Sequence, residues 1–344
     1  MKRAKKWYGR VKFLLKKKKN MKSILKKIFI TLGILVLLIL GYTWMNYAAD
    51  KSLEELKTKW AYDNSQFLEM DGMPVHYRIN GEGEPLVLIH GTGASLHTWE
   101  GWTEILEKDF KVISLDMPAF GLTGPNPEKI YTLEFYAKFL DSFLEKIEVD
   151  KFSIAGNSLG GGIAWKYTSL FPNKVKNMIL IDPMGYPRKG ELPFALRLAA
   201  NKYASKYLKT VTPKSLFYKS MNEVFHNDEL VTDELVNRYY ELYLREGNRQ
   251  AFVDRAMAKE TVDTLEIATI KTPTLILWGE KDEWISPKDA PKFQRDIIGS
   301  ELITYPNAGH VPMEELPKLT AHDARIFLEK NLVKEIESDL SIIE

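Results

Sequence analysis

The chain has 344 residues, 45% of them hydrophobic, which is enough for one large domain with additions or for two domains. It contains no cysteine, which excludes disulfides, thiolate metal sites and a cysteine nucleophile. The formal charge of +2 conceals an asymmetry, because residues 1–27 hold 13 of the 48 Lys and Arg and no acid, leaving 35 bases against 46 acids in the rest.

A transmembrane helix is the first element that the sequence predicts. Residues 28–49 carry no charge, and as a helix these 22 residues span roughly 33 Å, about the thickness of a bilayer core. Tyr42, Trp44 and Tyr47 stand near its far end, where interfacial aromatic residues are common. The positive-inside rule then predicts that residues 1–27 form a basic cytoplasmic segment and that an uncleaved signal anchor tethers the C-terminal domain outside the cytoplasm.

Two alternatives stay open at this end of the chain. One is a cleaved signal peptide, although the apolar run is longer than a usual h-region and Asn46 or Tyr47 would stand where cleavage needs a small residue. The other is translation from Met21, which would leave enough lysines to orient the helix. The lysine run indicates a patch that contacts lipid rather than a nucleic-acid site, because the acidic domain behind it would repel phosphate.

Beyond the anchor, a polar stalk at residues 50–66 precedes an alternation of short apolar runs and amphipathic segments. Apolar strands separated by helices predict a parallel sheet covered on both faces, with its core in residues 67–185 and 268–334. No strand is expected in residues 186–267, so we predict a helical cap over the strand ends. The expected strands include PLVLIHG, FKVISLDMP, KFSIAGNS, KNMILIDPM, PTLILWGEKD and ELITYPNAGH.

A serine between glycines marks the end of one of these strands. Gly156, Ser158 and Gly160 fit the pattern G-x-S-x-G after a strand and before a helix, which is the context of a nucleophile elbow. On that strained turn the glycines let neighbouring backbone pass close to the serine. A simple tight turn would use the same residues, so a nucleophile also requires a base, an orienting acid and an oxyanion site.

The other members of a Ser, acid, His series follow in chain order. Asp282 comes after the strand-like run LILWGEK, and His310 follows the next strand in YPNAGH. We therefore predict a catalytic triad of Ser158, Asp282 and His310. Asp182 also ends a strand, in LIDPMG, and is the alternative acid.

Two backbone N–H groups complete the predicted site. In a site of this kind, one oxyanion donor comes from the loop after the strand that ends in HGTG, and the other from the residue after the nucleophile. These donors are the N–H groups of Thr92 and Leu159. His90 stands at the end of the same strand, where we expect it to shape the loop rather than to act as a base.

The order of these motifs resembles the α/β-hydrolase family: strand, HGTG, strand, LDMPAFGLT, GNSLGG, cap, GEKDEW and GHVP. The resemblance covers roughly residues 66–334. It implies an α/β-hydrolase fold, a mostly parallel eight-stranded sheet with a helical cap after the sixth strand, preceded here by the transmembrane helix. The serine excludes the branches of this family that use an aspartate nucleophile, and the chemistry requires no metal or organic cofactor.

These features predict a membrane-anchored serine hydrolase that cleaves carboxylic esters through an acyl-enzyme. Its partners would be a small apolar ester substrate and, through the N-terminal helix, the lipid bilayer, with no role for nucleic acid. Aromatic residues of the cap are candidates for lining an apolar acyl or alcohol pocket. They are Phe194, Tyr203, Tyr207, Phe217 and Tyr218.

Two other functions stay open. GNSLGG, Trp278 before GEKDEW, and Arg238 in TDELVNRYYEL resemble the meta-cleavage-product hydrolases, which cleave a carbon–carbon bond in a vinylogous diketo acid. In that subfamily a cap arginine binds the substrate carboxylate, so the resemblance makes Arg238 and Trp278 candidate substrate-binding residues. HGTGASLHTW departs from the longer glycine run that is usual there. The remaining hypothesis is a tethered binding protein without catalysis, and neither the natural substrate nor the oligomeric state can be read from the sequence.

Overall fold

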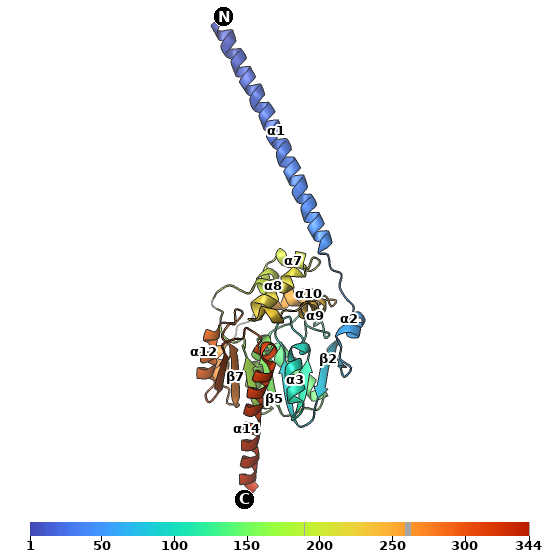
Figure 1. The fold of residues 1–344 in the computed structure, drawn as a ribbon, viewed down its shortest axis with the longest axis vertical. Coiled ribbons are helices and arrows are strands. Elements are labelled where there is room, and N and C mark those ends of the chain that lie inside the picture. Colours follow the sequence, from blue (N-terminus) through green and yellow to red (C-terminus); the bar gives the residue numbers. More distant parts are fainter. Residues whose placement is uncertain (189, 259–262, 344) are drawn as a thin grey trace. The chain divides into compact units, whose positions relative to one another are not determined.

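The computed structural model of the protein describes residues 1–188, 190–258 and 263–343, with side chains through residue 337. By its internal contacts the chain divides into two compact units, Met1–Tyr47 and Ala48–Glu344. The second unit holds every strand of the described chain (Figure 1).

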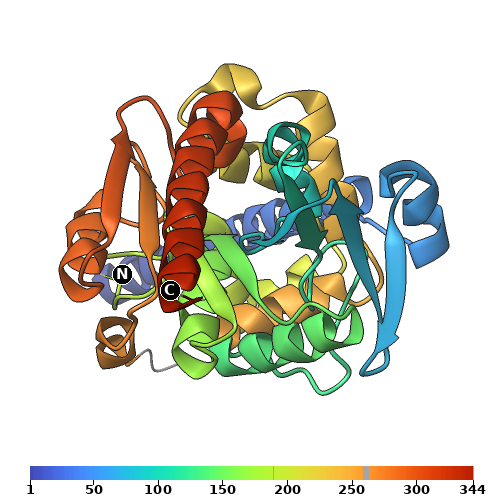
Figure 2. The same cartoon turned by 90° about the horizontal axis from the view of Figure 1, so that it is seen from below.

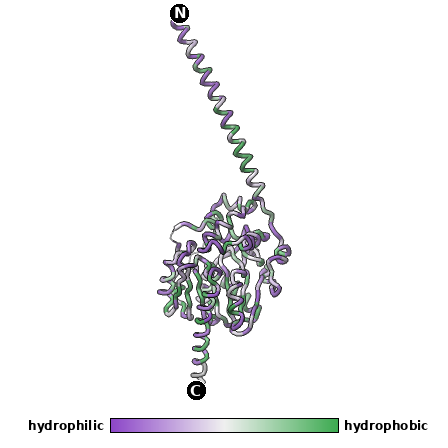
Figure 3. The backbone as a smooth tube through the Cα atoms, in the orientation of Figure 1, coloured by the Kyte–Doolittle hydropathy of each residue, from purple (hydrophilic) through white to green (hydrophobic). Residues whose placement is uncertain are grey.

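The first unit is one helix, α1 (Lys2–Met45), which joins the basic segment and the apolar run without a break. It begins far ahead of the expected anchor because Lys, Arg and Leu are good helix formers. Figure 3 shows its hydrophilic N-terminal part in purple and the apolar part in green. The helix is long enough and apolar enough to cross a membrane, and none of its residues is buried.

In the described residues, eight strands form one sheet with the order β1-β2-β4-β3-β5-β6-β7-β8. β2 is antiparallel to both of its neighbours, and every other pair is parallel. The prediction of a mostly parallel eight-stranded sheet is therefore confirmed. The strands are β1 (Gln66–Met70), β2 (Met73–Asn80), β3 (Glu84–Ile89), β4 (Phe110–Leu115), β5 (Phe152–Asn157), β6 (Val175–Ile181), β7 (Thr274–Gly279) and β8 (Glu301–Tyr305).

Alternate side chains of the strands pack into two hydrophobic cores on opposite faces of the sheet. In β3, Leu86 and Leu88 belong to one core and Val87 and Ile89 to the other, as the period of two in a strand requires. Helices α3 and α14 cover the first core, and α4, α5 and α12 cover the second (Figure 2). These helices are α3 (Glu100–Leu106), α4 (Leu133–Lys146), α5 (Leu159–Leu170), α12 (Ala290–Asp296) and α14 (Pro317–Ile343).

The segment expected to be a stalk packs onto the folded unit instead. It contains α2 (Leu53–Trp60), whose N-terminus is capped by the Ser52 hydroxyl. Leu56 is buried against Leu122 and Leu242. A stalk was the expectation because the segment is polar overall, and composition does not reveal that Leu56 is buried or that Lys59 and Trp60 bond to Glu241.

Short helices fill the described part of the chain between β6 and β7, where no strand was expected and none is found. Figure 1 shows α7 to α10 grouped on one side of the sheet of the second unit. This is the side where the parallel strands end, because residues that follow β3 and β5 line a pocket together with cap residues. The elements are α6 (Phe194–Ala200), α7 (Ala204–Leu208), α8 (Ser215–Val224), η2 (Asp228–Leu230), α9 (Asp233–Tyr243), α10 (Asn248–Met257) and α11 (Thr264–Ala268).

Candidate active site

Ser158 stands on a sharp turn between a buried strand and a helix. β5 ends at Asn157 and α5 begins at Leu159, and Ser158 between them has φ 56° and ψ −115°. A positive φ is strained for a residue with a Cβ, and such strain is typical of functional turns. A Cβ on Gly156 would lie 2.2 Å from the carbonyl oxygen of Gly160, so this position requires glycine. The backbone has the geometry of a nucleophile elbow.

The side chains of Asp282 and His310 are hydrogen-bonded to each other. Nδ1 of His310 lies 2.7 Å from Oδ2 of Asp282, and both residues are buried. The other carboxylate oxygen of Asp282 accepts N–H bonds from Trp284 at 2.6 Å and from Ile285 at 2.9 Å. The Trp284 ring also stacks on the imidazole, with 5.6 Å between the ring centroids. Because both carboxylate oxygens are bonded, the carboxylate is fixed where it can orient and stabilise the imidazole.

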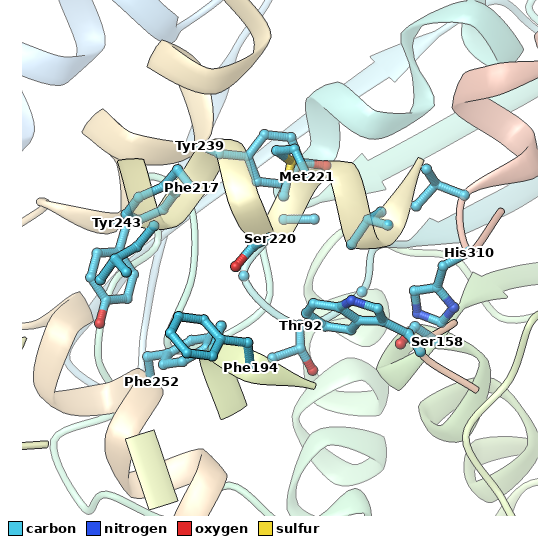
Figure 4. A pocket seen from close by; sticks show the side chains of 18 of the residues that line it. Thr92, Ser158, Phe194, Phe217, Ser220, Met221, Tyr239, Tyr243, Phe252 and His310 are labelled. Carbon is cyan, nitrogen blue, oxygen red and sulfur yellow. The ribbon is translucent and has the colours of Figure 1, made fainter. Parts of the chain in front are cut away.

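The second ring nitrogen of His310 is buried and has no hydrogen-bond partner among the residues that the structure describes. Figure 4 shows this ring beside Ser158 at one end of a pocket. Because Asp282 accepts a hydrogen bond from Nδ1, the proton of the neutral ring lies on Nδ1 and Nε2 keeps its lone pair. A base in this state can accept a proton from the serine hydroxyl.

Asp182 lies beside Asp282, because the two residues follow the neighbouring strands β6 and β7. One oxygen of each carboxyl and one ring nitrogen of His310 lie within 4.8 Å of one another. Asp182 accepts the Gly279 N–H at 3.0 Å and is fully buried. Burial, and then the negative charge of Asp282, raise the pKa of Asp182 well above its usual range. Both effects favour the protonated form of Asp182.

These three side chains also define the metal-binding capacity of the site. Together they could offer two carboxylate oxygens and one imidazole nitrogen. The carboxylate of Asp282 and the imidazole of His310 are already hydrogen-bonded to each other, at 2.7 Å. The arrangement therefore matches an acid and base pair better than a set of free metal ligands.

Two backbone segments meet at Ser158. Leu159 is the first residue of α5, so its N–H has no acceptor within the helix and lies at the positive end of the helix dipole. Thr92 lines the same pocket as Ser158. A Cβ on Gly91 would lie 3.2 Å from the Ser158 Cβ, so the loop that carries Thr92 packs against the serine. Leu159 thus follows the serine directly, and Thr92 lines the pocket that contains it.

His90 holds this loop in place. Its Nε2 accepts the N–H of Met117 at 2.9 Å, so its Nδ1 donates to the Gly91 carbonyl, 2.8 Å away. Complete burial lowers the pKa of His90, which keeps the ring neutral. Both ring nitrogens form hydrogen bonds with backbone groups near the site, as expected for a residue that shapes the loop.

The pocket next to Ser158 and His310 is apolar and extends into the cap (Figure 4). Among the described residues that line it there is no Asp, Glu, Lys or Arg. The cap side chains that carry a polar group in this pocket all carry a hydroxyl, and they are Thr212, Ser220, Tyr239 and Tyr243. The apolar side chains of the cap include Phe194, Leu198, Leu208, Leu216, Phe217, Met221, Val224 and Phe252.

Comparison with known proteins identifies the family. A family model described as alpha/beta hydrolase fold matches residues 84–317, more than half of the chain. The chain belongs to this family. The match covers the elbow, the cap and both strand ends that carry Asp282 and His310, so the resemblance in the motifs is confirmed for the fold and the hydrolase class.

Relatives of this α/β hydrolase include enzymes of two kinds. It is 29% identical over 249 residues to the 2-hydroxy-6-oxo-2,4-heptadienoate hydrolase of Pseudomonas putida, covering 70% of this chain and 87% of that protein. It is 27% identical over 256 residues to lipase 3 of a Moraxella species, covering 72% of this chain and 78% of that protein. The solved meta-cleavage product hydrolase of Pseudomonas fluorescens shares the fold, with a TM-score of 0.66 at 23% identity, over 77% of this chain and 97% of that one.

Only some of the aromatic residues expected in the pocket of this hydrolase reach it. Phe194 and Phe217 line it. Tyr203 is 79% exposed and Tyr207 is 40% exposed, so both lie on the cap surface. The Tyr218 hydroxyl donates to Asp233 at 2.6 Å, outside the pocket. The sequence shows that these residues are aromatic, but not which face of each short helix is buried.

Sequence reasoning missed four aromatic residues that line the pocket, Tyr239, Tyr243, Phe252 and Trp284. One signal was present, since Tyr239 and Tyr243 are four residues apart and therefore share a face of α9. The Tyr243 and Phe252 rings also contact each other edge to face, with 5.4 Å between centroids. That contact joins α9 to α10 and could not be read from either segment alone.

Neither residue suggested by the meta-cleavage resemblance lies in this pocket. Trp278 is in β7, is fully buried and packs against Phe293 in the core. Arg238 lies 3.2 Å from Glu314 and lines a different pocket, beside Trp60 and Tyr62. The substrate-binding expectation for these two residues therefore has no geometric support, because Trp278 lies inside a strand and Arg238 forms a partly buried ion pair in another pocket.

Proposed function

We propose that this α/β hydrolase is a membrane-anchored serine hydrolase that cleaves carboxylic esters with an apolar acyl or alcohol group. The Ser158 oxygen attacks the ester carbonyl while Nε2 of His310 takes its proton. The tetrahedral intermediate then collapses, the carbon–oxygen bond to the alcohol breaks, and His310 returns the proton to the leaving alcohol. Water attacks the acyl-enzyme through the same base and releases the carboxylic acid and free Ser158.

One observation carries this proposal: His310 is hydrogen-bonded to Asp282 through Nδ1, and its buried Nε2, beside Ser158, has no hydrogen-bond partner in the described part of the chain. A buried polar atom without a partner is costly, so its persistence favours a functional role. A binding protein without catalysis would gain nothing from it. The negative oxygen of the intermediate would be stabilised by the N–H groups of Thr92 and Leu159, each worth about 3 kcal/mol in sites of this kind.

The chemistry of the pocket favours esters over diketo acids. A meta-cleavage substrate brings a carboxylate, and burying a charge without a partner costs several kcal/mol or more. No cation lines the described pocket, and Arg238 is occupied by Glu314. An uncharged ester with an apolar chain would bind in the same pocket through burial of apolar surface. Such burial stabilises binding by about 25 cal/mol for each Å² removed from water.

The location follows from α1 and its charges. Its apolar part is long enough to span a bilayer, and its lysines lie on the N-terminal side. Moving even one such charge to the membrane centre costs about 2.5–3.5 kcal/mol on insertion scales. We therefore propose that the N-terminus stays in the cytoplasm and that the hydrolase unit lies outside it. Protease treatment of intact spheroplasts should degrade the hydrolase unit, and full protection until lysis would reverse this orientation.

Activity of the full chain in detergent tests the reaction. The substrates are p-nitrophenyl esters of increasing acyl length and a 2-hydroxy-6-oxo-dienoic acid, each with wild type and Ser158→Ala. We expect hydrolysis of the esters, no cleavage of the dienoic acid, and loss of activity in the variant by about 10⁴-fold or more. Cleavage of the dienoic acid with higher kcat/KM than any ester would replace this proposal with the carbon–carbon hydrolase.

A further inference from the structure

Positive charge is concentrated on one part of the cap. Residues 192–222, which we call the basic cap segment, contain six Lys and Arg and no acid. The chain after residue 27 has the opposite balance, 46 acids against 35 bases. A basic patch on an otherwise acidic protein indicates an anionic partner. The six cations are Arg197, Lys202, Lys206, Lys209, Lys214 and Lys219.

The centre of this segment exposes lysines and tyrosines together. Lys202 and Lys206 are exposed, and so are Tyr203 and Tyr207, each of which directly follows one of these lysines. Among the described residues, no carboxylate lies within ion-pair distance of Lys202, Lys206 or Lys209. Cations attract anionic headgroups, and amphipathic tyrosine rings favour the membrane interface. The surface formed by α7 and the residues on either side of it therefore has the composition of a membrane-contacting surface.

Hydrogen bonds tie the basic cap segment to the residues that follow α1. The Ala48 N–H donates to the Thr210 carbonyl at 3.2 Å. The Arg249 side chain bridges the same two stretches, donating to Asp50 at 2.7 Å and to the Thr212 hydroxyl at 3.3 Å. Ala48 comes three residues after α1 ends at Met45, so covalent geometry limits it to about 10 Å from that end. If α1 spans a bilayer, Thr210 lies close to the headgroups.

The opposite side of the same helices forms the wall of the pocket. Leu198 in α6, Leu208 in α7, and Leu216 and Phe217 in α8 all line it. The surface that exposes these lysines and tyrosines and the pocket next to Ser158 thus lie on opposite sides of one layer of cap helices. An ester dissolved in the bilayer would have only this layer to cross.

We propose that the basic cap segment docks on the surface of an anionic lipid bilayer, and that the pocket receives its ester from that bilayer. The second part rests on the ester hydrolysis proposed above, whereas the first part does not. Docking would add a second, electrostatic attachment to the one made by α1. The substrates of this hydrolase would accordingly be lipid-soluble esters resident in the membrane.

A spin label at Tyr203 tests the docking directly. The chain has no cysteine, so Tyr203→Cys accepts a nitroxide at one position only. The full chain carrying Ser158→Ala is reconstituted into vesicles of phosphatidylcholine, with or without phosphatidylglycerol. Accessibility of the label to oxygen and to a water-soluble nickel complex is then measured. Because this readout needs no catalysis, its failure is separate from a failure of the proposed reaction.

Charge variants give the expected size of the effect. Each lysine near an anionic surface changes binding about fivefold, so Lys202→Gln, Lys206→Gln and Lys209→Gln together should lower the docked-to-free ratio by about 100-fold. The control neutralises Lys108, Lys146 and Lys151, which are exposed and lie near the starts of β4 and β5, at the edge of the sheet away from the cap.

We expect the label to be protected from nickel in vesicles that contain phosphatidylglycerol, with protection lost in the cap variant and kept in the control. Added salt should also reduce the protection of the label, because it screens the attraction between exposed charges. A label that stays equally accessible to nickel in both lipids, or equal protection in the cap variant and wild type, would overturn the docking. A full chain that fails to float with the vesicles would overturn it too.

Discussion

Replacing Asp282 with Asn should reverse the direction of one hydrogen bond. One oxygen of Asp282 accepts two N–H groups, from Trp284 and Ile285, and only an oxygen can do so. The amide oxygen of Asn must therefore take that side, and its NH₂ group must face Nδ1 of His310. A donor at this place requires Nδ1 to be the acceptor, so the ring proton moves to Nε2.

The size of the loss follows from that tautomer. With its proton on Nε2, His310 has no lone pair for the Ser158 hydroxyl and cannot act as the base. An Asp to Asn change of this kind lowers kcat by about 10⁴-fold. At 1.36 kcal/mol for each factor of ten, this equals about 5.4 kcal/mol of barrier. The assay is steady-state hydrolysis of a p-nitrophenyl ester by the full chain.

Asp182→Asn is the matched control, because burial raises the pKa of Asp182 and favours its protonated form, which an amide mimics. Its oxygen can still accept the Gly279 N–H, and its NH₂ can face Asp282. We expect kcat to change less than about tenfold, and thermal unfolding should show both variants folded. Comparable losses in the two folded variants, or Asp282→Asn with more than a tenth of wild-type kcat, would refute the assignment of roles.

Three further changes test other parts of the structure. Ser220 lies midway along the pocket, so a phenylalanine there should block the space for a long acyl chain. Ser220→Phe should lower kcat/KM for long-chain esters at least about tenfold and leave kcat/KM for acetyl esters unchanged. Equal losses on both kinds of ester would place the acyl chain elsewhere. Asp116 is buried against His76 and its pKa is lowered to about 2, so its contribution to stability should be complete above about pH 4 and disappear as pH falls toward 2. Urea unfolding of wild type and Asp116→Asn across this range checks the sign, and a difference between them that grows as pH falls would contradict it. Arg238→Ala should leave kcat on esters within about threefold of wild type. The variant should be less stable, because Glu314 loses its partner. Loss of ester activity in the folded variant would give Arg238 a role in the site.

Local patterns made most of the fold predictable. Leu86 to Ile89 are apolar on both faces, which indicates a strand in the middle of a covered sheet. Ser158 is flanked by the small residues that a close backbone approach requires, so the elbow could be placed before its dihedral angles were known. The chain order of serine, acid and histidine added the rest of the candidate triad.

Contacts between distant segments were not predictable. Asp182 and Asp282 looked like competing candidates because each follows a strand. Only the pairing of β6 with β7 makes them neighbours, and that contact raises the pKa of Asp182 further than burial alone. Arg238 was a candidate for binding a substrate carboxylate, but its partner in the structure is Glu314, which stands 76 residues away in the sequence. Leu56 docks α2 through a single buried side chain. Each depends on tertiary packing, which overrides composition and local propensity.

The most direct measurement of the central claim is the mass of the full chain after treatment with a fluorophosphonate. Attack by the serine oxygen displaces fluoride and leaves a phosphonyl group on that residue, which peptide sequencing locates. We predict one adduct, on Ser158, that forms in the wild type, is lost in His310→Ala and is competed by a long-chain ester. An adduct on another residue, or none on Ser158 in the folded protein, would contradict the proposal that Ser158 is the nucleophile.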